Sequence, residues 1–139
     1  MKIDGILLVV GALLVMGTVR CRGEQVWDSG NTLFEVIGYD LQAHDANVQL
    51  TDYQTNQVCM LLGYFRGFAE ASALASHYDA TSLPFVLPAS ITNDQIERIV
   101  YQFLKDNPDK RNLEGDALVG AALAKAFPNP SFMPPIGTR

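Results

Sequence analysis

The residue types that could carry catalytic or metal-binding chemistry are few and widely spaced in this chain. Its two histidines, His44 and His77, both fall in segments that we expect to be loops. No spacing of His, Cys, Asp and Glu matches a zinc or calcium site, and the sequence contains neither a glycine-rich phosphate loop nor a Gly-x-Ser-x-Gly motif. The sequence therefore predicts neither a metal site nor a cofactor.

Cys59 and His77 form a nucleophile–base pair only if the fold brings them together. Cys59 lies in an apolar helical pattern, four to five turns before His77. We therefore interpret it as a small buried side chain rather than as a catalytic nucleophile. Helix capping and solvation explain the carboxylates that could otherwise form acid–base pairs, namely Asp52, Asp79, Asp94 and Glu97. By elimination, the sequence favours a binding protein over an enzyme.

The charge balance narrows the class of partner. The chain has 139 residues, enough for one domain, and a net charge of −5. Residues 24–139 contain 14 acidic and 7 basic side chains, which gives 14 − 7 or seven net negative charges. Phosphate contacts need basic clusters, so this surface argues against nucleic acid and favours a solvated face or a basic partner protein.

The N-terminus has the pattern of an export signal. Lys2 precedes an apolar run over residues 5–19, which has the length of a signal peptide and is short for a membrane span. We expect residues 1–23 to be removed and residues 24–139 to form the domain, with no stable membrane insertion afterwards. Cleavage before Glu24 leaves Cys59 alone, whereas cleavage before Thr18 allows Cys21 and Cys59 to pair. An uncleaved anchor is the alternative, because Arg20 and Arg22 follow the apolar run.

A long central helix, from about Thr51 or Asp52 to Ser76, is the element that must position the other segments. One face repeats at three- and four-residue steps: Val58, Leu61, Leu62, Phe65, Phe68, Ala69 and Ser72. A second row steps by four: Gly63, Gly67, Ala71 and Ala75. Because a glycine inside a helix costs about 1 kcal/mol relative to alanine, we expect another helix to pack closely on this row.

Three further helices complete the prediction. A short first helix starts at Asn31 or Thr32 and ends or weakens at Gly38, so that residues 39–49 form a loop; a further helical turn within that segment is the alternative. A third helix is capped by Thr92 with Gln95, and a fourth starts near residues 112–116 and ends at Pro128. Residues 83–88 contain two prolines and are predicted to be an extended segment on the core. The expected fold is all-α, a small bundle of about four helices.

The order of several short motifs resembles the Rap/Tai family of type VI secretion immunity proteins. The resemblance covers residues 30–128. Its motifs are Gly30-Asn31-Thr32-Leu33, Gly63-Tyr64-Phe65-Arg66-Gly67, Phe85-Val86-Leu87-Pro88, the helix end from Tyr101 to Pro108, the bend at Lys110-Arg111 and the closing Ala126-Phe127-Pro128. Leu61 and Val86 stand where family members usually carry cysteines that can form a disulfide, which implies a packing contact instead.

The resemblance implies a periplasmic all-α protein, often a homodimer, that binds and blocks a peptidoglycan amidase effector. The chemistry then belongs to the amidase, and a protruding element of the immunity protein fills its active-site groove. An alternative from a different class is a non-catalytic helical adaptor of the cell envelope. We expect partner contacts in the two polar loops, at Asp40, His44, Asp45, His77, Tyr78 and Asp79.

Overall fold

The computed structural model describes residues 28–133, and within them the chain forms four α-helices and one short 3₁₀ helix. The helices are α2 (Gly30–Asp45), α3 (Asp52–Tyr78), α4 (Asn93–Asp106), η1 (Pro108–Lys110) and α5 (Gly115–Ala126). Residues 28–133 contain no strand, although Phe85 and Pro128 form an isolated antiparallel bridge. The predicted all-α bundle of about four helices is confirmed.

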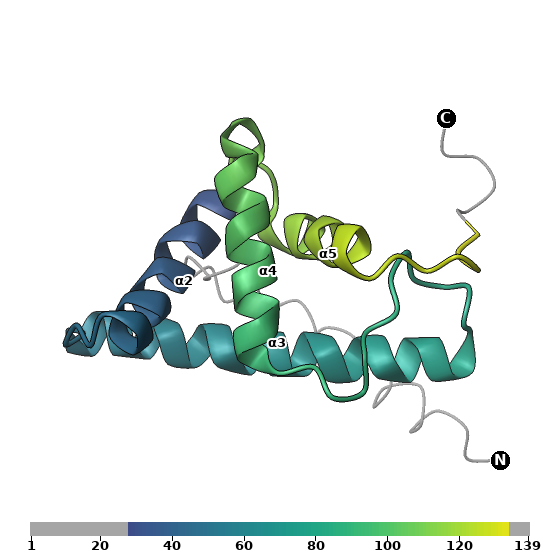
Figure 1. The fold of residues 1–139 in the computed structure, drawn as a ribbon, viewed down its shortest axis with the longest axis horizontal. Helices are drawn as coiled ribbons and strands as arrows, with labels where there is room; N and C mark the ends of the chain where they lie inside the picture. The colour runs from purple at the N-terminus through teal and green to yellow at the C-terminus, as the bar shows by residue number, and fades with distance from the viewer. Residues whose placement is uncertain (1–27, 134–139) are drawn as a thin grey trace, which may run out of the picture.

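The long helix α3 is the base on which the other elements rest (Figure 1). α2 rises from the N-terminal end of α3, α4 crosses α3 near its middle, and α5 lies beside the upper part of α4. The C-terminal half of α3 extends beyond α4. It is covered mainly by the segment that leads to α4 and by the chain after α5. The core comprises Leu33, Val36, Ile37, Val58, Leu61, Phe65, Phe85, Ile96, Val100, Leu104, Leu118, Val119, Ala122 and Leu123.

The start of α2 is fixed by contacts with the bend before α5. The backbone N–H groups of Gly30 and Asn31 donate to the carbonyls of Leu113 (3.0 Å) and Arg111 (2.8 Å). A Cβ atom on Gly30 would lie 2.4 Å from the Leu118 side chain and 2.9 Å from the Arg111 backbone, so only glycine fits there. The Gly30-Asn31 motif therefore marks a close approach between two segments that are far apart in the sequence.

A stack of three side chains reinforces the same junction. The Arg111 guanidinium lies 3.7 Å from the centre of the Phe34 ring, and the Phe34 ring stacks on Tyr101 with centroids 4.7 Å apart. The Nε of Arg111 also donates to the Leu104 carbonyl (2.7 Å) at the end of α4. Cation–π and aromatic contacts of this kind thus join α2, α4 and the bend.

The predicted loop over residues 39–49 is wrong for residues 39–45, because α2 continues through Gly38 to Asp45, and it is confirmed for residues 46–49. The apolar face persists past Gly38 through the partly buried Tyr39 and Leu41, and tertiary packing offsets the low helix propensity of glycine. Similarly, α3 ends at Tyr78 rather than Ser76, so His77 and Tyr78 are helical. The Thr51 and Thr92 starts are confirmed as capping boxes, which pair with Gln54 and Gln95.

Two expectations for α3 are also wrong. Gly63, Gly67 and Ala71 are exposed, and a Cβ atom on either glycine would meet nothing within 4 Å, so no other helix within residues 28–133 packs on that row. Cys59 is a free, exposed cysteine rather than a buried one. The buried face of α3 is the other row, which includes Val58, Leu61 and Phe65.

The extended segment between α3 and α4 is confirmed, but its anchor differs from the expected one. Val86 is 47% exposed, so it does not pack on the fully buried Leu61 as the family resemblance implied. Phe85 is the buried residue, and its ring stacks on Phe68 of α3 with centroids 6.0 Å apart. The backbone N–H of Val86 donates to the Phe127 carbonyl (3.0 Å), which ties the segment to the chain after α5.

Candidate partner-binding surface

The six predicted contact residues lie at opposite ends of α3. Asp40, His44 and Asp45 belong to the last turns of α2, which end beside the start of α3, whereas His77, Tyr78 and Asp79 lie at the end of α3. A helix of 27 residues is about 40 Å long. The structure therefore brings the six residues together as two groups of three, not as one surface.

The group on α2 is engaged within the molecule. Asp40 is buried, and His44 Nδ1 lies 3.3 Å from Asp40 Oδ1. The Asp45 carboxylate accepts two hydrogen bonds from the Arg98 guanidinium, at 2.9 and 3.2 Å, and these hold the pKa of Asp45 below its usual range. Arg98 also donates to Asp94 (3.0 Å). These contacts join α2 to α4 and leave His44 as the most exposed member of the group.

The group on α3 faces solvent. Tyr78 is 82% exposed, and the His77 ring packs edge-on against it with centroids 5.6 Å apart. Asp79 caps the helix, and its side chain accepts hydrogen bonds from the backbone N–H (2.8 Å) and the hydroxyl (2.7 Å) of Thr81. These two bonds lower the pKa of Asp79 and fix the turn that follows α3. An exposed aromatic pair is thus presented beside an ionised carboxylate.

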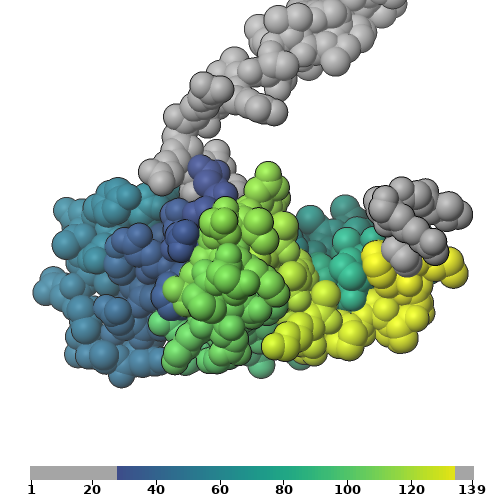
Figure 2. All heavy atoms as spheres, turned by 90° about the horizontal axis from the view of Figure 1, so that it is seen from above, coloured from purple at the N-terminus to yellow at the C-terminus, as the bar shows by residue number. Residues whose placement is uncertain are grey.

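The chain after α5 holds this turn in place through hydrogen bonds. The Asn129 side-chain amide donates to the carbonyls of Ala80 (2.7 Å) and Leu83 (2.8 Å), and the Asn129 backbone N–H donates to Pro84 (3.0 Å). The Met133 backbone N–H donates to the Thr81 carbonyl (3.4 Å), and the Met133 side chain is 72% exposed. Figure 2 shows the C-terminal segment, in yellow, at the same end of the molecule as the end of α3, in teal. We call His77, Tyr78, Asp79 and Met133 the tip surface.

An open groove lies beside the Arg66–Glu70 ion pair of α3. Its volume is about 590 Å³, and it is lined by α3 on one side and by residues 87–93 on the other. The lining combines Arg66 and Glu70 with apolar groups such as Leu87 and Ile91. The groove is wide and open, so it can accept a protruding side chain or peptide segment rather than enclose a small substrate.

The fold keeps Cys59 away from His77. Cys59 and His77 are separated by 18 residues of one continuous helix, which is about 27 Å, so they cannot act as a nucleophile–base pair. Within residues 28–133, no group of three or more His, Cys, Asp and Glu side chains is placed to hold a metal ion.

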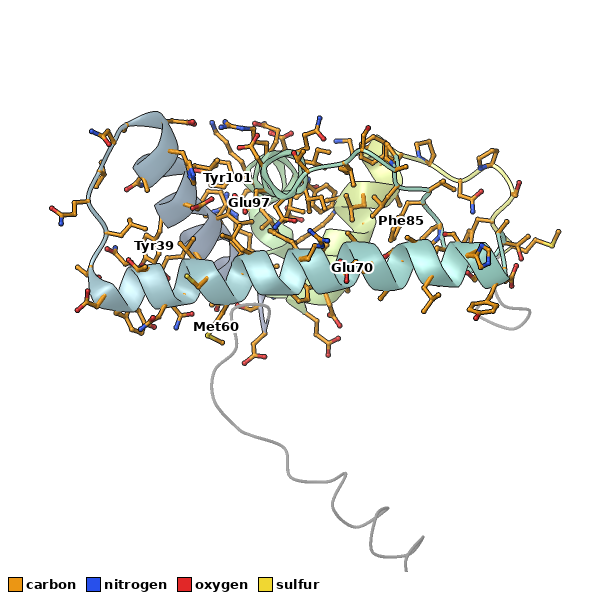
Figure 3. The ribbon with its side chains drawn as sticks, turned by 90° about the horizontal axis from the view of Figure 1, so that it is seen from below. Tyr39, Met60, Glu70, Phe85, Glu97 and Tyr101 are labelled. Atoms are coloured by element: carbon orange, nitrogen blue, oxygen red, sulfur yellow. The ribbon has the colours of Figure 1, made fainter. Side chains whose placement is uncertain are left out.

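Glu97 is the residue that sequence reasoning missed, because it was expected to be solvated. It lies on α4 and is only 1% exposed. Burial raises its pKa to about 8, helped by its hydrogen bond with Asp40 and by the negative charge of that carboxylate. Figure 3 shows Glu97 on the inner side of α4. The sequence did contain a signal for this burial, because Glu97 lies three residues before Val100 and seven before Leu104, on the same apolar helical face.

A comparison with protein families identifies the family to which this chain is related, which the geometry alone does not show. A family model described as Rap1a immunity proteins matches residues 29–129. No curated protein and no solved structure matches the chain. The matched range begins at the Ser29 cap of α2 and ends at Asn129, the residue that braces the tip surface. The family relationship therefore covers the four helices and the contacts that tie their ends together.

Proposed function

Because the chain belongs to the Rap1a immunity protein family, we propose that it binds a peptidoglycan amidase effector of a type VI secretion system and blocks the active-site groove of that enzyme. In this proposal, residues 1–23 direct export, and residues 24–139 act in the periplasm as a non-catalytic homodimer. The amidase carries the chemistry, and the immunity protein prevents substrate from entering.

The observation that carries this proposal is the tip surface. It combines an exposed tyrosine and an ionised aspartate at the end of α3 with an exposed methionine from the chain after α5, beside a turn that Asn129 holds. Exposed aromatic side chains on pre-ordered segments supply much of the binding energy in protein interfaces, because little conformational entropy is lost on binding. The acidic chain also complements a basic rim around an enzyme groove.

The test is to mix the purified protein with each exported amidase encoded beside its gene. Binding is measured by calorimetry, and inhibition is measured by the release of peptidoglycan fragments. We expect the cognate amidase to be inhibited at a 1:1 ratio of chains. Tyr78→Ala should weaken binding by about 30-fold, which corresponds to the 2 kcal/mol of an interface hot spot.

Tyr53→Ala is the matched control. Tyr53 is 68% exposed and lies at the opposite end of α3, so its truncation removes the same side chain from a different place. Retained binding by Tyr53→Ala together with loss in Tyr78→Ala supports the tip surface. Equal affinities for the wild type and Tyr78→Ala would show that the amidase is engaged elsewhere. Inhibition of none of the amidases would refute the proposed function.

A further inference from the structure

A small polar pocket lies between α2 and the first turns of α3, at the end of α3 opposite to the tip surface. Its volume is about 160 Å³. Figure 3 shows Tyr39, which forms part of its wall, where α2 approaches the first half of α3. The lining residues are Thr32, Glu35, Val36 and Tyr39 from α2, and Tyr53 and Gln57 from α3. We call this site the α2–α3 pocket.

The spacing of the lining residues explains why both helices contribute to one pocket. On α2 they recur at steps of three and four residues, and on α3 they are one turn apart, so each helix turns one face toward the other. Val36 is 3% exposed and closes the floor, whereas Glu35 and Tyr53 are exposed at the rim. The pocket therefore combines an apolar floor with a polar rim that a ligand can reach.

Glu35 is the only charged residue among the described residues that line the pocket. The Tyr39 hydroxyl donates a hydrogen bond to Glu35 Oε1, which orients the carboxylate and leaves Oε2 available to a ligand. This hydrogen bond, together with burial and the charge of Glu35, raises the pKa of Tyr39. The Tyr39 hydroxyl therefore stays protonated and continues to hold the carboxylate.

The two tyrosine rings complete a site for an organic cation. Tyr39 and Tyr53 come from different helices, so the pocket has an aromatic ring on each side. Aromatic faces attract ammonium and guanidinium groups, and a carboxylate gives such groups a charge-assisted hydrogen bond. An anion would be repelled by Glu35, and an apolar ligand would bury that charge without a partner. A calcium ion needs more oxygen ligands than one carboxylate supplies.

The surroundings of the pocket favour a ligand of the same charge. Residues 24–139 contain 14 acidic and 7 basic side chains, and this excess attracts cations to the molecule. The partial positive charge at the N-terminus of α3 opposes a cation, but Asp52 in the first turn offsets it. A volume of about 160 Å³ suits one amine or guanidine group on a short alkyl chain rather than a folded peptide segment.

We propose that the α2–α3 pocket binds an alkylammonium or alkylguanidinium group, with Glu35 as its counter-ion and the rings of Tyr39 and Tyr53 as its walls. The group belongs to a free amine or to a lysine or arginine side chain of a protein other than the effector. This site goes beyond the proposed function, because Tyr53 and Tyr78 are 25 residues apart on one continuous helix, which is about 37 Å. The pocket and the tip surface are therefore occupied independently.

NMR titration with n-butylammonium tests the site, using the same purified protein as in the amidase assay with ¹³C-labelled tyrosine rings. The signals of Tyr39 and Tyr53 should shift with saturable, millimolar affinity, whereas the signal of Tyr78 should not move. 1-Butanol has the same carbon chain without the charge and should give no saturable shift. A blocked Gly-Lys-Gly peptide separates the two sources: tighter binding than n-butylammonium assigns the cation to a protein side chain, and equal or weaker binding assigns it to a free amine.

Two substitutions and a control assign the binding to the named groups. Glu35→Gln should weaken n-butylammonium binding about tenfold, because it removes the counter-ion and keeps the shape. Tyr53→Leu should weaken it about fivefold, because it removes one ring. Glu70→Gln makes the same chemical change as Glu35→Gln at an exposed site outside the pocket, and it should bind like the wild type. Both pocket residues are exposed, so circular dichroism should show that the two variants are folded.

Three results would overturn the inference: binding of 1-butanol as tight as that of n-butylammonium, equal affinities for Glu35→Gln and Glu70→Gln, or shifts confined to tyrosines outside the pocket. Glu35→Gln should inhibit the amidase as well as the wild type does, because the tip surface is unchanged. Loss of cation binding with inhibition retained, or the reverse in Tyr78→Ala, separates this site from the proposed function.

Discussion

Replacing Glu97 with glutamine is expected to remove a pH-dependent loss of stability from this protein. The Glu97 side chain is almost fully buried on α4, and its carboxyl group shares a hydrogen bond with the buried carboxyl group of Asp40 on α2. Asp94 adds a further negative charge, and the Arg98 guanidinium opposes it only in part. Glutamine has the same shape and can donate a hydrogen bond to Asp40 at any pH.

The magnitude follows from the pKa of Glu97, which burial raises from its ordinary value of 4.5 to about 8. Between these two values the folded protein binds a proton that the unfolded chain has released, so the free energy of unfolding falls as the pH rises. For a single group, this loss is about 1 kcal/mol at pH 5.5 and about 4 kcal/mol at pH 7.5, relative to low pH. The difference across that range is therefore about 2–3 kcal/mol.

Urea unfolding at several pH values between 5.5 and 7.5 measures this difference. The gap in unfolding free energy between Glu97→Gln and the wild type should widen by about 2–3 kcal/mol over the range. Glu70→Gln makes the same chemical change at an exposed site and should leave the wild-type slope unchanged. Parallel pH profiles for Glu97→Gln and the wild type would refute the reasoning, because they would mean that Glu97 ionises alike in both states.

Three further substitutions test the packing at Gly30 and the support that Asn129 gives to the turn after α3. Gly30→Ala should lower the free energy of unfolding by about 1–3 kcal/mol, because its Cβ atom collides with Leu118 and Arg111, whereas Gly67→Ala should raise it by up to about 1 kcal/mol. Urea unfolding of both variants checks the opposite signs, and an equal effect of the two would contradict the packing described at Gly30. Asn129→Ala removes three side-chain hydrogen bonds, two of them to the turn and each contributing about 1 kcal/mol, and should speed amide exchange in residues 80–84 far more than in α4. Unchanged exchange in residues 80–84 would show that Asn129 does not hold the turn.

The helices could be predicted where periodicity and capping agree. Thr92 and Gln95 form a complete capping box before a strongly periodic face, and α4 was predicted correctly from those signals. The end of α2 could not be predicted, because Gly38 is a local stop signal and only the packing of later residues overrides it. Local propensity is a weak guide wherever a helix is held by tertiary contacts.

The candidate site was predictable only in part. Tyr78 and Asp79 were identified as exposed polar residues, and the structure places both on the tip surface, where their role in partner binding stays a prediction. Asp40 and Asp45 look equivalent to Asp79 in sequence, yet they face Glu97 and Arg98 across the α2–α4 contact. That difference depends on contacts with residues more than 50 positions away. Local patterns in a single sequence do not predict such contacts.

The hydrogen bonds made by Asn129 affect which positions of this protein can vary in sequence without loss of the fold. Asn129 holds the turn through the backbone carbonyls of Ala80 and Leu83, so the support does not depend on which side chains the turn displays. Tyr78 and Met133 contribute little to the core, because most of each side chain is in solvent. Under the proposed function, mutations at these positions change the surface offered to the effector with little loss of folding stability. The tip surface can then follow changes in the effector while the helices behind it stay the same.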